Sequence, residues 1–73
     1  MTEREKTILA LAADGFSNKQ IGKTIEPRLA VHTVKNHMSS IMYKLKANDR
    51  THAVVLALRH RLMIIEGVND KGD

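Results

Sequence analysis

Five apolar residues in the middle of the chain recur at alternating steps of three and four positions: Val31, Val34, Met38, Ile41 and Leu45. An α-helix turns once in about 3.6 residues, so side chains at this spacing lie on one side of a helix. The pattern predicts an amphipathic helix over 31–46 whose apolar stripe is buried. The polar residues fall on the opposite face and its flanks: His32, Thr33, Lys35, Asn36, His37, Ser39, Ser40, Tyr43, Lys44 and Lys46.

Helix start and stop signals surround this segment. Thr2-Glu3-Arg4-Glu5 and Ser17-Asn18-Lys19-Gln20 have the form of capping boxes, in which the first and fourth side chains bond each other's backbone N–H. Gly15 suits a left-handed helix end, Pro27 disfavours helix at the residue before it, and Asp49 is a good N-cap. The sequence therefore predicts an all-α fold of four helices, near 3–14, 18–25, 31–46 and 50–62.

The fourth helix has more apolar residues than one buried face requires. Its inner stripe is predicted to consist of Ala53, Val54, Ala57, Leu58 and Leu62. Val55 and Leu56 are apolar but lie outside this stripe. They are predicted either to be exposed without a function or to form a contact surface.

The length of 73 residues corresponds to one domain, expected over 1–65, followed by a polar, glycine-containing tail over 66–73 that is expected to be disordered. There is no Cys, so disulfides and thiolate metal sites are excluded. No apolar run reaches the ~18 residues that span a bilayer, and we expect a cytoplasmic protein without membrane contact.

Positive charge is concentrated in the middle of the chain. Residues 17–61 hold nine Lys and Arg but only two acids, whereas the remaining residues hold three Lys and Arg and six acids. A basic centre with acidic ends suits a polyanionic partner, although a merely solvated basic surface has the same composition.

Enzymatic function is not expected. His32 and His37 are five positions apart, so they miss the one-turn spacing of a helical metal site, and there is no glycine-rich phosphate loop. A domain this small also has little room for a deep cleft. We expect no metal, no cofactor and no catalytic residue.

A short helix followed closely by an amphipathic one describes a helix-turn-helix. Four segments make the resemblance specific: Thr2-Glu3-Arg4-Glu5, Gly15-Phe16-Ser17-Asn18-Lys19-Gln20-Ile21, Thr33-Val34-Lys35-Asn36-His37, and Asn48-Asp49-Arg50-Thr51-His52-Ala53-Val54. In this order they resemble the LuxR/FixJ-type (GerE-like) DNA-binding domain of bacterial transcriptional regulators, including its patterns "G-x-S-N-K-E-I-A" and "T-V-K-x-H". The resemblance covers residues 1 to about 64.

The resemblance implies binding to double-stranded DNA in the bacterial nucleoid, transcriptional regulation, and a homodimer formed through the fourth helix. RNA polymerase is a further candidate partner. Family positions that face bases match Lys35, Asn36 and Ser39, and His32 is added from its place on the same face. Family positions near phosphates match Ser17, Lys19, Thr33, His37 and Lys44, and Lys46 is added for its charge. The expected dimer contact is Val55, Leu56 and Arg59.

Three departures from the family pattern stand out. The turn at 26–30 is two residues longer than usual, Ala30 replaces the usual Ser N-cap of the recognition helix, and Arg61 replaces a common Gly. Losing the cap costs roughly 1 kcal/mol. One alternative is an earlier helix start with Pro27 in the first turn.

The sequence leaves alternative interpretations open on three points. Tyr43 either packs beside the fourth helix or contacts DNA. The chain is either a stand-alone regulator or the C-terminal domain of a longer response regulator. The alternative function is a protein-interaction module on the same fold, in which the longer turn impairs DNA docking.

Overall fold

The computed structural model describes residues 1–60. In this part the chain forms four helices and no strand: α1 (Glu3–Ala13), α2 (Asn18–Thr24), α3 (Val31–Leu45) and α4 (Arg50–Arg59). The predicted all-α fold is confirmed, and the first three helices each end one residue before the predicted end. The predicted extension of the fourth helix to 62 includes residues outside the described part. The domain limit at 65, the tail 66–73 and the departure at Arg61 lie outside it altogether.

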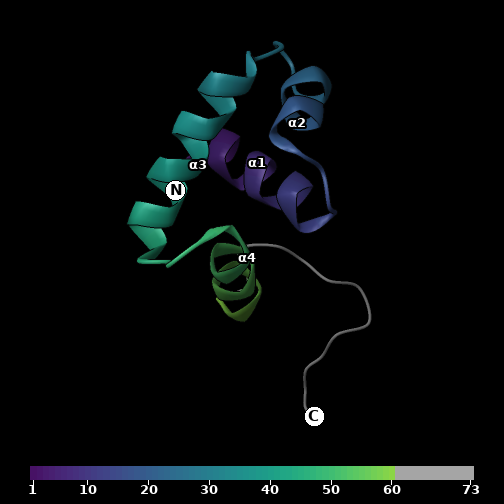
Figure 1. Cartoon of the computed structure of the whole chain (residues 1–73). Helices are drawn as coiled ribbons and strands as arrows, with labels where there is room; N and C mark the ends of the chain where they lie inside the picture. Colours follow the sequence, from purple (N-terminus) through teal and green to yellow (C-terminus); the bar gives the residue numbers. More distant parts are fainter. Residues whose placement is uncertain (61–73) are drawn as a thin grey trace.

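Helix α3 contacts each of the other three helices, as α1 also does. In Figure 1, α1, α2 and α4 lie on one side of α3, and the other side of α3 is left uncovered. The short α2 precedes α3 in the chain and packs against it, which is the helix-turn-helix arrangement. The fold thus presents one long helix at the edge of a small bundle.

Both predicted capping boxes are formed. The Thr2 hydroxyl accepts a hydrogen bond from the Glu5 backbone N–H (3.1 Å), and the Glu5 carboxylate accepts one from the Thr2 N–H (2.9 Å). Ser17 and Gln20 make the same pair of bonds at the start of α2, at 3.2 and 2.8 Å. Asp49 caps α4 through its side chain. These local bonds fix where three of the four helices begin.

The core is built from aliphatic residues of all four helices: Ile8, Leu9, Ile21, Ile25, Val34, Met38, Ile41, Ala53 and Ala57. The α3 stripe supplies Val34, Met38 and Ile41, as predicted. From α4 only two alanines are fully buried, and their small side chains let the helix approach the others closely.

Two residues predicted to be buried are exposed. Val31 is 48% exposed because it is the first residue of α3, and side chains on a helix lean toward its N-terminus, here past the end of the bundle. Leu58 is 38% exposed. It follows Ala57 directly, and one helical step of about 100° turns it away from the line through Ala53 and Ala57 that faces the core.

The longer turn between α2 and α3 is accommodated by a close backbone contact. The Leu29 N–H donates to the Gly22 carbonyl oxygen (3.0 Å). A Cβ on Gly22 would lie 2.2 Å from the Leu29 carbonyl oxygen, so only glycine fits there. The family pattern has Ala at this position. Helix α3 begins at Val31 after Ala30, which makes no side-chain cap bond, so the earlier start at Pro27 is not adopted.

This contact predicts that the substitution Gly22→Ala lowers the stability of the fold. Alanine in an ordinary helix position stabilises by about 1 kcal/mol relative to glycine. Here the added methyl must displace a backbone carbonyl, and overpacking of this kind typically costs 1–3 kcal/mol. Because the obstructing atom belongs to the backbone and cannot rotate away, the cost is expected at the upper end of this range. The net loss of about 1–2 kcal/mol should lower the melting temperature in circular dichroism by roughly 5–10 °C. Lys23→Ala, an exposed change in the same helix, is the control. A Gly22→Ala protein as stable as the wild type would contradict the contact.

Candidate nucleic-acid interface

The uncovered side of α3 carries the four residues predicted to face bases. His32, Lys35, Asn36 and Ser39 are all exposed, whereas Val34, Met38 and Ile41 on the other side are buried. The structure therefore brings these four together on one continuous face. Their donors and acceptors are available to a ligand lying along the helix.

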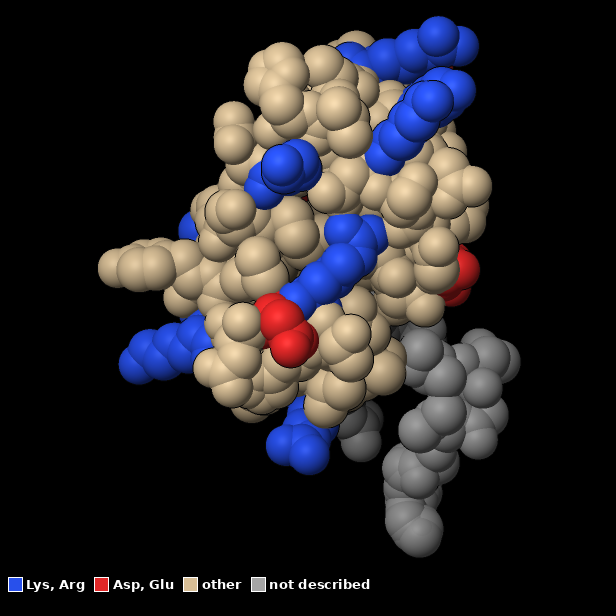
Figure 2. Space-filling view, in the orientation of Figure 1, with Lys and Arg blue, Asp and Glu red and all other residues tan. Residues whose placement is uncertain are grey.

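Acidic residues are absent from this helix and its approaches. No Asp or Glu occurs between residues 27 and 48, a stretch that holds Arg28, Lys35, Lys44 and Lys46. Figure 2 shows Lys and Arg side chains projecting from several parts of the surface in that view, and an acidic side chain lies against one of them. The electrostatic character of α3 thus suits an anionic partner.

The residues predicted to lie near phosphates have different surroundings. Ser17 and Lys19, at the start of α2, are exposed, although the Ser17 hydroxyl is already engaged in the cap. Thr33 and His37 are half-buried on the flanks of α3. Lys46 is exposed but is not helical, because it ends α3 in the left-handed conformation (φ 56°). This set borders the α3 face without forming a single cluster.

Tyr43 does not pack beside α4. Its side chain is the most exposed of the large apolar and aromatic ones among residues 1–60, at 85%. The prediction that Tyr43 packs beside the fourth helix is therefore wrong.

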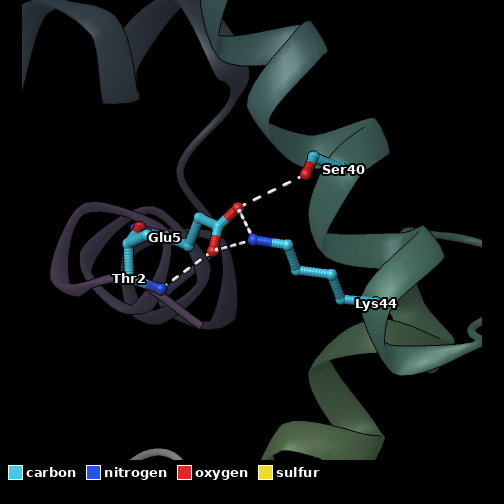
Figure 3. A network of polar contacts seen from close by, with 4 residues as sticks. All are labelled: Thr2, Glu5, Ser40 and Lys44. Atoms are coloured by element: carbon cyan, nitrogen blue, oxygen red, sulfur yellow. Dashed lines mark hydrogen bonds and ion pairs between the residues drawn. The ribbon is translucent and has the colours of Figure 1, made fainter.

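Lys44 is held by a buried carboxylate. Its ammonium lies 2.9 Å from both carboxylate oxygens of Glu5, which is only 4% exposed, and the Ser40 hydroxyl donates to the same carboxylate at 3.4 Å. Figure 3 shows Glu5 reaching from the first turn of α1 to these two residues of α3. The capping box predicted Glu5 as a local cap, and no sequence pattern pointed to its second role.

This environment shifts the ionisation of Glu5. The hydrogen bond from Lys44 and then that from the Thr2 N–H favour the charged carboxylate, and together they outweigh burial, which opposes it. They lower the pKa of Glu5 to about 2. The carboxylate is therefore charged throughout the physiological range and holds α1 and α3 together.

A second polar contact ties α4 to the start of α2. The Arg50 guanidinium donates to the Asn18 side-chain oxygen and, at 2.6 Å, to the Phe16 carbonyl oxygen. The partners are more than 30 positions away in the chain, so spacing carried no signal for them.

The expected dimer residues lie on the outer side of α4. Val55 is 38% exposed, as is Leu58 one turn later, and Arg59 is exposed beside them. Leu56 is half-buried. The exposed apolar pair is therefore Val55 and Leu58 rather than Val55 and Leu56.

Residues 1–60 contain no group of His, Asp or Glu able to hold a metal ion. None of the helices in that range is long and apolar enough to cross a membrane.

Comparison with known proteins places this geometry in context. The family model for bacterial regulatory proteins of the luxR family (GerE) matches residues 1–57. The chain is 44% identical over 63 residues to the response regulator protein VraR of Staphylococcus aureus, of Staphylococcus saprophyticus and of Staphylococcus epidermidis. The match covers 86% of this chain and 29% of each relative, so the chain spans less than a third of their length.

The Glu5 carboxylate predicts an acid-dependent loss of stability. Its pKa is depressed in the folded state, so its contribution is complete above the unfolded pKa near 4.3 and declines as the pH falls toward 2. The Lys44 side chain is 44% exposed, and solvent weakens the ion pair accordingly. We therefore expect the charged Glu5 carboxylate to contribute about 2 kcal/mol to the free energy of unfolding. Glu5→Gln keeps a capping side chain but loses the charge, so its melting temperature at pH 7 should fall by roughly 10 °C.

The matched control is Glu3→Gln, which removes a carboxylate that is 92% exposed in the same helical turn. It should change the melting temperature little. If Glu5→Gln melted like the wild type at pH 7 and kept the same slope between pH 5 and 2, the Glu5–Lys44 contact would contribute nothing to the fold.

Proposed function

This chain belongs to the luxR family of bacterial regulatory proteins as a helix-turn-helix DNA-binding domain, and on that premise we propose that it reads double-stranded DNA by placing α3 in the major groove. The observation that carries the proposal is the exposed, acid-free face of α3 formed by His32, Lys35, Asn36 and Ser39. A major groove about 12 Å wide admits one α-helix. The relatives are response regulators, so we further propose that this is the effector domain of a regulator of that kind.

The side chains on the exposed face of α3 have the polar groups needed to distinguish DNA bases. The Asn36 amide offers a donor and an acceptor that match adenine, and the Lys35 ammonium donates to the O6 and N7 atoms of guanine. Ser39 and His32 extend the face by one turn on either side and supply further polar groups. Each well-formed pair of this kind discriminates between bases by about 1–3 kcal/mol.

The proposed phosphate contacts are Ser17, Lys19, Thr33, His37, Lys44 and Lys46. Lys19 and Lys46 are exposed and supply charge that displaces condensed counterions. Lys44 has three N–H donors, of which Glu5 takes two, so one remains for a phosphate. Contacts of this class position the domain and contribute affinity without reading sequence.

Dimerisation through α4 is the second part of the proposal. Val55 and Leu58 offer an apolar pair one turn apart, and Arg59 and the half-buried Leu56 lie beside them. A symmetric pair of such helices would bury this surface and place two α3 helices about one DNA turn apart.

Asn36→Ala and Lys46→Ala separate the two kinds of DNA contact. We expect Asn36→Ala to reduce the preference for a selected duplex over a scrambled one by roughly 5-fold or more, because a base contact is lost. Lys46→Ala should weaken binding to both duplexes alike and reduce the salt slope by about 0.9, because one phosphate contact is lost. Fluorescence anisotropy at several salt concentrations measures both quantities.

Lys6→Ala is the control, since it removes the same charge from α1. It should leave the affinity for both duplexes, the salt slope and the base preference close to those of the wild type. Failure of the wild type to bind any duplex at low salt would contradict the proposal and favour the protein-interaction alternative.

Val55→Glu tests the dimer face. A carboxylate on the exposed apolar pair should weaken self-association in sedimentation and reduce cooperative binding to two half-sites about one helical turn apart. His60→Glu places the same charge after the end of α4 on a different side and should do neither. Unchanged sedimentation and cooperativity in Val55→Glu would rule out this surface.

A further inference from the structure

Tyr43 is the one large side chain on the exposed face of α3 to which the proposed function assigns no role. It is 85% exposed, and no hydrogen-bond partner of its hydroxyl is seen among residues 1–60. A tyrosine usually covers its ring by packing while its hydroxyl stays wet. Here nothing in the described part of the chain covers the ring, so both the ring and the hydroxyl are accessible to a bound ligand.

The helical geometry aligns Tyr43 with the proposed reading residues. Seven residues separate it from Asn36, which places it within about 20° of Asn36 around the axis and about 10 Å further along. It is nearly opposite Ile41, which is fully buried. A ligand lying along the α3 face over Asn36 and Ser39 therefore meets Tyr43 next.

We propose that the Tyr43 hydroxyl donates a hydrogen bond to a backbone phosphate of the DNA bound along α3. The inference rests on the proposed function. A straight helix follows the floor of a curving groove only over its central turns, and residues toward its C-terminal end meet the sugar-phosphate backbone. Tyrosine hydroxyls are among the groups that bond phosphate oxygens. Lys46 follows three positions later and is exposed, so the local charge favours an anion.

Tyr43→Phe removes only the hydroxyl. Because the side chain is exposed, the fold should be retained, which a melting curve verifies. We expect binding about 10-fold weaker or more on selected and scrambled duplexes alike, the effect of losing a hydrogen bond to a charged acceptor. The salt slope should equal that of the wild type because no cation is lost, in contrast to Lys46→Ala.

A second measurement uses the tyrosine itself. The chain has one Tyr and no Trp, so its tyrosine emission reports on this position alone. Acrylamide, a neutral quencher that DNA does not repel, should quench the free protein efficiently and the duplex-bound protein several-fold less.

Each result has a defined meaning. Wild-type affinity in Tyr43→Phe, a shift in its sequence preference, or equal acrylamide quenching with and without duplex would each overturn the phosphate contact. If Asn36→Ala weakens selective binding while Tyr43→Phe does not weaken binding at all, only this inference fails. If the wild type binds no duplex, the proposed function and this contact fail together.

Discussion

A buried negative charge sets the main constraint on this structure. Glu5 is the one charged residue buried among residues 1–60, and a carboxylate taken out of water costs several kcal/mol unless it is paired and hydrogen-bonded. The requirement is met only when the first turn of α1 lies against Ser40 and Lys44, near the end of α3. Alternative packings of the two helices would leave the charge unpaired. The carboxylate therefore favours the packing in which the first turn of α1 lies against this part of α3.

The contact of Arg50 with Asn18 and the Phe16 carbonyl adds a second polar constraint between helices. It joins the start of α4 to the start of α2. In a domain of this size the apolar core is small and contributes limited specificity by itself. Two polar contacts between helices distant in sequence therefore fix an arrangement that aliphatic packing alone leaves less defined.

Sequence reasoning succeeded where the determining interactions are local. The capping boxes at Thr2 and Ser17 involve neighbours three positions apart, and the 3-4 period of α3 follows from helical geometry. It failed where a residue's surroundings depend on other helices: Val31 and Leu58 satisfy the period yet lie beyond the reach of the core. The exposed face of α3 could be predicted, because it lies opposite the apolar stripe of the same helix. The contact between Glu5 and Lys44 could not be predicted, because 39 positions separate the two residues in the chain.

Because of the contact between Gly22 and Leu29, the residue that position 22 can hold depends on the turn between α2 and α3. With this turn, the Leu29 carbonyl oxygen lies where a methyl group on residue 22 would be, so alanine has no room. Alanine at residue 22 fits only together with a turn that holds this carbonyl elsewhere. Changes in residue 22 and in the turn are therefore expected to have non-additive effects on stability.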